Sequence, residues 1–219
     1  MAFLKKIMSN KNQIKLEPKK FYHIYNRGNN GDYIFFKEKN YLFFLEKYGY
    51  YLYDYLDTYA YSLMQNHFHL LVKVKTRQEL FKVIKRDFIS IELNKINLSV
   101  SKIISEKFRR FFLSYSKAIN IQEKRTGSLF EKPFKRKLVN NPKYLKNLIY
   151  YIHFNPVLHK ICKNINDYDW TSYNLILSKQ KTKLKRKQTI DLFENELNFK
   201  KYHSIKQNFN NINDLIIEF

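Results

Sequence analysis

The sequence predicts an α+β fold, in which a central antiparallel β-sheet is flanked by α-helices. Segments with strand-like and helix-like patterns follow one another in the order strand, helix, strand, strand, helix, strand, helix. Two neighbouring strand-like runs are joined only by Gln65 and Asn66, which favours an antiparallel hairpin. No apolar run approaches the roughly 18 residues that a membrane span needs, so no membrane partner is expected.

The first strand is expected over residues 21–26, where aromatic and β-branched residues are followed by Gly28. A helix over 38–53 follows, because apolar residues recur at helical spacing between Tyr41 and Tyr48. These two elements begin the predicted core.

The hairpin strands are expected over residues 55–64 and 67–74. The long charged stretch 77–120 is loosely periodic and is predicted to be mostly helical, with a break near 97–99. The hairpin thus lies between two helical regions.

The last strand is expected over residues 134–139, which alternate in character after a glycine turn. A helix over 142–154 should follow, because Asn141 can cap it and Pro142 suits its first turn. Pro156 is expected to stop this helix.

A chain of 219 residues suits one main domain, expected over 20–175. Residues 1–19 are predicted to be a flexible basic arm and residues 176–219 a basic C-terminal extension. The basic run 183–187 is either a further DNA-binding arm or a disordered tail, with the tail favoured.

The composition points to a polyanionic partner. The chain has 41 Lys and Arg against 19 Asp and Glu, a formal charge of +22. Its 18 Tyr and 19 Phe could stack on unpaired bases, although most such rings serve as core. The lone Cys162 excludes a disulfide scaffold and a cysteine zinc site, and with no signal-peptide pattern a cytoplasmic location is expected.

The run SLMQNHFHLLVKV contains His67 and His69 on a predicted strand, where residues two apart share a face while Phe68 points to the opposite side. Such a pair can hold a metal ion or can be structural, and the spacing alone does not decide between these. The chain has no H-E-x-x-H motif and no calcium-binding acidic loop, so further ligands must come from elsewhere.

The helix after Asn141 offers such a ligand. Tyr151 and Asn155 are four residues apart and so share a helical face, and the Asn carbonyl is a ligand for hard divalent ions. A tyrosine beside such an ion can attack a phosphodiester and form a covalent phosphotyrosine. The alternative is an ordinary buried tyrosine in a tyrosine-rich protein. Tyr150 should point about 100° away on the helix.

Five segments in this order resemble the single-tyrosine HUH transposases, and most closely the repetitive-extragenic-palindrome-associated tyrosine transposases. They are YHIYNRG (22–28), AYSLMQNHFHLLVKV (60–74), RTGSLFEKPFKRKLV (125–139), YIHFNPVLHK (151–160) and DYDWTSY (167–173). The resemblance covers roughly residues 20–175. It implies a ferredoxin-like core and a catalytic domain of this type.

The resemblance also implies roles. His67, His69 and Asn155 would hold Mg²⁺ or Mn²⁺, and Tyr151 would be the nucleophile that cleaves single-stranded DNA near a hairpin, leaving a 5′-phosphotyrosine and a free 3′-hydroxyl. Tyr115 is a weaker candidate nucleophile, because Ile119 rather than a ligand lies four residues further on. Three of the other four histidines, His23, His153 and His159, are expected to be structural or on the surface.

The expected DNA contacts are basic side chains near turns or in clusters: Arg27, Arg109, Arg110, Lys132, Lys135, Arg136 and Lys137. The expected partner is single-stranded or hairpin DNA, bound by a monomer or a homodimer. Two other hypotheses compete with the strand transferase. One is a catalytically inactive, domesticated hairpin-binding protein, and the other is a phosphodiesterase that uses a metal-bound water.

Overall fold

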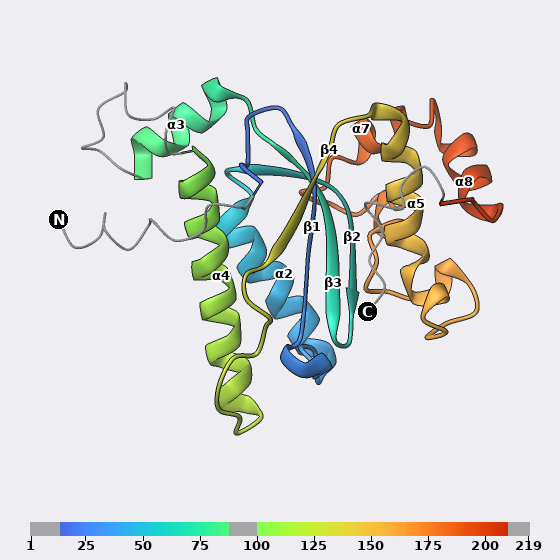
Figure 1. Ribbon diagram of the computed structural model, residues 1–219. Coiled ribbons are helices and arrows are strands. Elements are labelled where there is room, and N and C mark those ends of the chain that lie inside the picture. Colours follow the sequence, from blue (N-terminus) through green and yellow to red (C-terminus); the bar gives the residue numbers. More distant parts are fainter. Residues whose placement is uncertain (1–13, 88–99, 210–219) are drawn as a thin grey trace.

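The core is a four-stranded antiparallel sheet with the strand order β2-β3-β1-β4 (Figure 1). The computed structural model describes residues 14–87 and 100–209 of the chain. The strands are β1 (Phe21–Arg27), β2 (Leu56–Met64), β3 (His67–Val74) and β4 (Lys135–Val139). With a helix between β1 and β2 and helices between β3 and β4, this order is the ferredoxin-like arrangement, so the predicted α+β fold class is confirmed.

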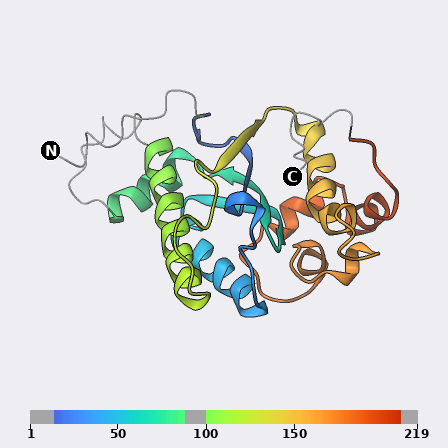
Figure 2. The same ribbon diagram turned by 60° about the horizontal axis from the view of Figure 1, so that its bottom comes forward.

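The helices form layers on both faces of this sheet (Figures 1 and 2). Helices α2 and α4 pack together on one face, whereas α5 covers β2 and β3 on the other, with α7 and α8 beside it. The helices are α2 (Glu38–Leu52), α3 (Arg77–Asp87), α4 (Val100–Gln122), α5 (Pro142–Leu158), α6 (Tyr173–Leu177), α7 (Arg186–Asp191) and α8 (Glu196–Ser204). The expected helical break near 97–99 lies outside the described residues.

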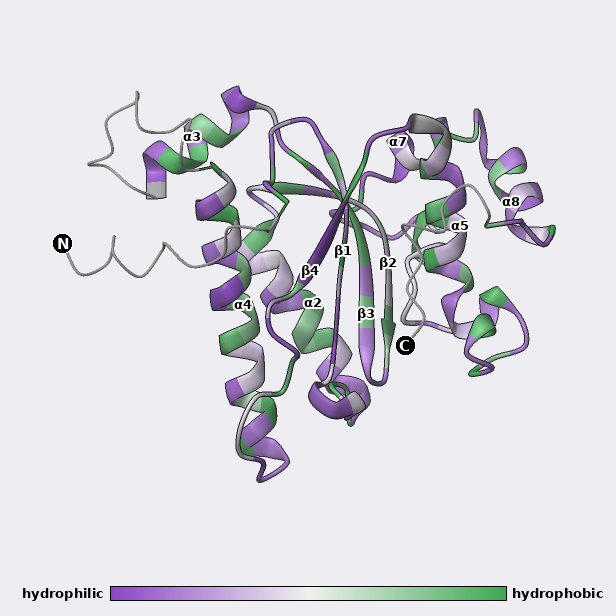
Figure 3. Ribbon diagram, viewed as in Figure 1, coloured by the Kyte–Doolittle hydropathy of each residue, from purple (hydrophilic) through white to green (hydrophobic). Residues whose placement is uncertain are grey.

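The layer between the sheet and α2 and α4 is an aromatic core. Phe68 of β3 is fully buried there, with its ring 5.1 Å from Phe44 and 5.9 Å from Phe112. Apolar and polar residues alternate along α4 (Figure 3), because this helix turns one face to the core and the other to solvent. Phe68 therefore anchors β3 to the helical layer.

Helix α5 continues past the expected stop and ends at Leu158, with Pro156 inside it. A proline this close to the C-terminus removes only one helical hydrogen bond, the bond to the carbonyl of Ile152. The helix ends where Lys160 adopts a positive φ of 57°. The prediction that Pro156 stops the helix is wrong, and Asn155 consequently stays within the same helix as Tyr151.

The described parts of both terminal segments pack on the domain. Leu16 is buried, and its amide donates to Ser101 Oγ at 2.9 Å. In the basic run 183–187, Leu184 is buried and the Lys185 amide donates to the carbonyl of Thr58. The disordered tail favoured for this run is therefore wrong. No helix in the described ranges is both long and apolar enough to cross a membrane.

A buried hydrogen-bonded chain ties α8 to the sheet. His203 Nδ1 donates to the carbonyl of Phe199 at 2.8 Å, so its Nε2 accepts from His153 Nδ1 at 3.0 Å. His153 Nε2 then accepts from Ser172 Oγ at 2.7 Å, and Ser172 Oγ accepts from the amide of Tyr61 on β2. Burial lowers the pKa of both imidazoles, so both are neutral at pH 7. His153 faces away from Tyr151's side of α5.

Replacing Phe68 by Ala should lower the free energy of unfolding by about 3–5 kcal/mol, because it leaves a cavity under β3. Urea denaturation measures this loss. The matched control is Tyr50→Ala, since Tyr50 is 80% exposed and its loss should cost about 0.5 kcal/mol or less. Equal losses in the two variants would contradict the role of Phe68 as an anchor.

Acid should destabilise the fold through these histidines. Burial lowers the pKa of His203 to about 4, below its ordinary 6.5. Below pH 6.5 the unfolded chain protonates this histidine, whereas the folded chain protonates it only near pH 4. Stability is therefore lost as the pH falls from about 6.5 to about 4. Each such histidine adds at most about 1.4 kcal/mol per pH unit. In urea denaturation at several pH values, His203→Gln should show a shallower dependence than the wild type, and an unchanged slope would contradict this role for His203.

Candidate active site

His67 and His69 lie at the start of β3, on the face that α5 covers. Cα partners across the sheet are Arg27 for His67 and Tyr25 for His69, both on β1. The two histidines are 2% and 0% exposed, and Phe68 between them points into the opposite aromatic layer. The expected separation of the two imidazoles from Phe68 is therefore observed.

Helix α5 places Tyr151 and Asn155 against these imidazoles. The ring of Tyr151 is 5.6 Å from that of His69, in an edge contact at 76°. Asn155 Oδ1 is 3.0 Å from His67 Nε2, and both residues are buried. The structure thus brings together all four residues that were expected to form the catalytic site.

The site is buried and electrically neutral at pH 7. Burial lowers the pKa of His67 to about 4 and that of His69 well below its ordinary value, with smaller effects from neighbouring charges. A neutral imidazole carries a lone pair that a metal ion can use. Asn155 Nδ2 is also buried and has no hydrogen-bond partner among the described residues.

This donor set fits a divalent ion. His67 Nε2 and Asn155 Oδ1 lie 3.0 Å apart in a buried hydrogen-bonded contact, so an imidazole nitrogen and an amide oxygen, both of which can serve as metal ligands, face the same place. No three His, Cys, Asp or Glu side chains in the described ranges are arranged to hold a metal by themselves. A metal here would therefore need the amide oxygen as well as the two imidazoles.

Two histidines with no expected role also lie at the site. His23 Nε2 on β1 is 2.9 Å from His69 Nδ1, and the ring of His159 is 5.0 Å from that of His67. Tyr25 is a further neighbour, with its ring 6.2 Å from His69. Strand periodicity puts His23 and Tyr25 on one face, but that this face adjoins β3 could not be derived from spacing.

The other candidate tyrosines are placed away from the site. Tyr115 lies on α4, on the opposite face of the sheet, and its hydroxyl donates to the carbonyl of Ile34 at 2.7 Å. Burial also raises the pKa of Tyr115, and its position on the opposite face of the sheet keeps it away from the candidate metal ligands. Tyr150 turns away from His69 and stacks on Phe154 at 5.0 Å.

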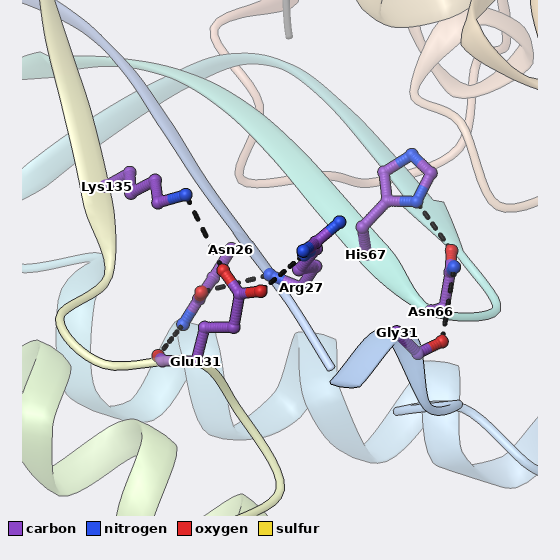
Figure 4. A network of polar contacts seen from close by, with 7 residues as sticks. All are labelled: Asn26, Arg27, Gly31, Asn66, His67, Glu131 and Lys135. Carbon is purple, nitrogen blue, oxygen red and sulfur yellow. Dashed lines mark hydrogen bonds and ion pairs between the residues drawn. The ribbon is translucent and has the colours of Figure 1, made fainter. Parts of the chain in front are cut away.

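Three of the expected DNA contacts border the site. Arg27 pairs with Glu131, and Lys135 Nζ lies 3.5 Å from the same carboxylate (Figure 4). Lys137 is the Cα partner of His23, so it shares the face of the sheet on which the histidines lie. These three basic residues form a positively charged border beside β1 and β4.

The remaining expected contacts are not part of this border. Arg136 is 9% exposed and donates to Ser105 Oγ on α4 at 2.9 Å, so its guanidinium lies on the opposite face of the sheet. Arg109 and Arg110 pair with Glu106 on α4, also beyond that face. Lys132 is exposed in the segment before β4. Grouping Arg136 with its neighbours was an error, because alternate strand residues face opposite sides.

The fold and these side chains define a ferredoxin-like α+β domain that carries a His-x-His pair beneath a helical tyrosine. Among solved structures, the chain is similar to one described as a REP-associated tyrosine transposase bound to a REP hairpin. The TM-score is 0.56 and the identity 14%, over 78% of this chain and 87% of that one. At this identity the likeness shows a shared fold.

A second similar structure is a bacterial tRNA(His) guanylyltransferase-like protein in complex with GTP. Its TM-score is 0.34 and its identity 11%, over 74% of this chain and 78% of that one. No protein-family model matches the sequence, and no curated protein does.

Proposed function

We propose that this chain is a metal-dependent tyrosine transposase that cleaves and rejoins single-stranded DNA at hairpin-associated sites. One observation carries the proposal: Tyr151 of α5 packs on His69 while Asn155, one turn further, lies 3.0 Å from His67. A nucleophile and three candidate metal ligands thus meet in one buried place. Covalent cleavage of a phosphodiester needs both a nucleophile and a group that stabilises charge on the phosphate, such as a metal ion.

In the proposed reaction the phenolic oxygen of Tyr151 attacks the phosphorus of a phosphodiester. The new bond joins phosphorus to the tyrosine oxygen, and the bond from phosphorus to the 3′-oxygen breaks. The phenolic proton is released and the departing 3′-oxygen takes one up, so the protons balance. The 3′-hydroxyl of a strand can later attack the 5′-phosphotyrosine and restore a phosphodiester. This step needs no ATP, because the phosphotyrosine link conserves the energy of the phosphodiester bond that was broken.

The chain's own residues would orient this reaction. His67, His69 and Asn155 would hold Mg²⁺ or Mn²⁺, which when bound supplies positive charge to a phosphate oxygen. The edge contacts of Tyr151 with His69 and with His23, at 5.6 and 6.3 Å, limit where its ring can lie. Arg27 faces His67 across the sheet and brings a second positive charge towards the same place.

The substrate class rests on charge and on the similar structure. A formal charge of +22 favours a polyanion, and the similar transposase was described with a REP hairpin. Lys135 and Lys137 lie on the strand that borders the site and would position the phosphate backbone. We therefore propose DNA recombination or transposition as the role.

Replacing Tyr151 by Phe should abolish covalent attachment while DNA binding remains, because only the nucleophilic oxygen is removed. The test incubates the protein with Mn²⁺ and hairpin DNA labelled downstream of the cleavage site, and looks for a labelled protein band on a denaturing gel. Tyr150→Phe is the matched control and should form the adduct like the wild type. An adduct in Tyr151→Phe would overturn the assignment.

Two other wild-type results would point to the competing hypotheses. Cleavage without any protein-linked product would indicate a water nucleophile. Tight hairpin binding without cleavage would indicate an inactive binding protein.

Neutralising Lys135 and Lys137 should weaken hairpin binding for all sequences and flatten its salt dependence. The slope of log K against log salt should fall by about one for each phosphate that a neutralised lysine no longer binds. The control is Arg109→Ala with Arg110→Ala on α4, beyond the opposite face, which removes the same charge. Fluorescence anisotropy at several salt concentrations measures both. An equal fall in the two double variants would contradict a localised DNA path.

A further inference from the structure

Each of the two histidines in the pair has its own hydrogen-bond partner at Nδ1. His67 Nδ1 is 2.7 Å from Asn66 Oδ1, and His69 Nδ1 is 2.9 Å from His23 Nε2. One partner comes from the turn between β2 and β3, and the other comes from β1. No role was expected for either partner, and neither is a candidate ligand or nucleophile.

The contact with Asn66 fixes where His67 carries its proton. The Asn66 side chain lies between the His67 ring and Gly31, with its Nδ2 3.5 Å from the carbonyl of Gly31 (Figure 4). Its Oδ1 therefore faces His67 and can only accept, so His67 Nδ1 must donate. Asn155 Oδ1, 3.0 Å from His67 Nε2, can also only accept, and a neutral ring cannot donate to both oxygens. Turning the Asn155 amide over resolves this, because its Nδ2, which has no partner among the described residues, then donates to Nε2. His67 then carries its proton on Nδ1 and its lone pair on Nε2.

The turn that carries Asn66 is itself held in place. The carbonyl of Asn66 accepts a hydrogen bond from the amide of Gly28 at 2.7 Å. The carbonyl of Gln65 accepts from the amide of Ile34 at 2.8 Å. Glycine is needed at position 28 for the loop that provides this amide, because an added Cβ would lie 1.8 Å from the carbonyl oxygen of Asp32. The position of Asn66 is thus determined by backbone contacts.

His23 can play the corresponding part for His69. Both side chains are fully buried, and their rings lie 5.1 Å apart with 27° between their planes. Only one proton can lie between the two facing nitrogens. If His69 Nδ1 donates it, His69 Nε2 keeps its lone pair for an ion, whereas the reverse arrangement leaves the proton on His69 Nε2.

We propose that Asn66 and His23 are positioning residues that hold His67 and His69 as Nδ1–H tautomers, so that both Nε2 atoms can bind a metal ion. This inference rests on the metal site of the proposed function. His23 acts through His69 and is not a ligand, because its Nε2 faces His69 Nδ1. Loss of such outer partners lowers metal affinity by about 10- to 100-fold in other sites.

The first test reads the tautomers without metal or DNA. Long-range proton–nitrogen correlation spectra distinguish the Nδ1–H from the Nε2–H form of each histidine. Wild-type His67 and His69 should both be Nδ1–H. In His23→Leu the signal of His69 should shift towards the Nε2–H form, while His67 stays unchanged. His69 as Nε2–H in the wild type, or as pure Nδ1–H in His23→Leu, would overturn the inference.

The second test measures Mn²⁺ binding by calorimetry. His23→Leu and Asn66→Ala should each weaken binding by about 10-fold or more. His23→Gln should restore most of the affinity, because the amide oxygen can accept from His69 Nδ1. Asn66→Asp likewise keeps an acceptor for His67 Nδ1. The control is Tyr50→Ala, which removes an exposed side chain from α2 on the opposite face of the sheet and should leave the affinity unchanged.

The results separate this inference from the proposed function. Unchanged Mn²⁺ affinity in both His23→Leu and Asn66→Ala, with wild-type adduct formation intact, would overturn the positioning role alone. Weakened Mn²⁺ binding in these variants, with no adduct in the wild type, would support the positioning role and overturn the strand transferase. If His23→Leu does not fold, Asn66→Ala in the surface turn gives the same comparison for His67. Failure of the wild type to bind Mn²⁺ would overturn both proposals.

Discussion

The pleat of β3 is the constraint on which the rest of the site depends. Successive side chains leave a strand on opposite faces, so burial of Phe68 among the rings of α2 and α4 forces His67 and His69 to the side of α5. A register slip of one residue would bury two imidazoles in an aromatic layer without hydrogen-bond partners. Hydrogen bonding to β1 on one side and β2 on the other holds this register.

The second face of the sheet then has to satisfy buried polar groups. His67 contacts Asn66 and Asn155 through its ring nitrogens, and His69 contacts His23. Two of these partners, Asn155 and His23, come from elements that are distant in sequence. Helix α5 supplies Asn155 one turn after Tyr151, and it continues through Pro156 to Leu158. The same helix carries His153, which faces away and ties α5 to α8. One helix therefore joins the site to the C-terminal extension.

Local sequence patterns predicted much of this arrangement, whereas contacts between segments distant in sequence were missed. His67 with Phe68 and His69, and Tyr151 with Asn155, follow from strand and helix periods, which are local properties. His23 could not be assigned, because its role requires β1 to lie beside β3, which depends on the order of strands in the sheet.

Two other predictions failed for different reasons. The position of Arg136 could have been predicted from strand alternation, since Lys135 and Lys137 flank it on the opposite face. The packing of residues 183–187 could not, because a single buried Leu184 is hidden in a run of charges, where one apolar anchor is too sparse to give a periodic signal.

The distribution of charge bears on how such a site could act on a phosphodiester. The chain has a formal charge of +22, yet the three candidate ligands, His67, His69 and Asn155, are neutral. A neutral donor set cancels none of the charge of a divalent ion, so its whole charge would remain for the phosphate, whereas a carboxylate in place of Asn155 would neutralise part of it. The acidic side chain paired with the border, Glu131, binds Arg27 and Lys135 and so holds positive charge at the edge of the site. Positive charge around a neutral centre would suit the proposed reaction, in which a polyanionic strand would have to bring one phosphate to a buried tyrosine.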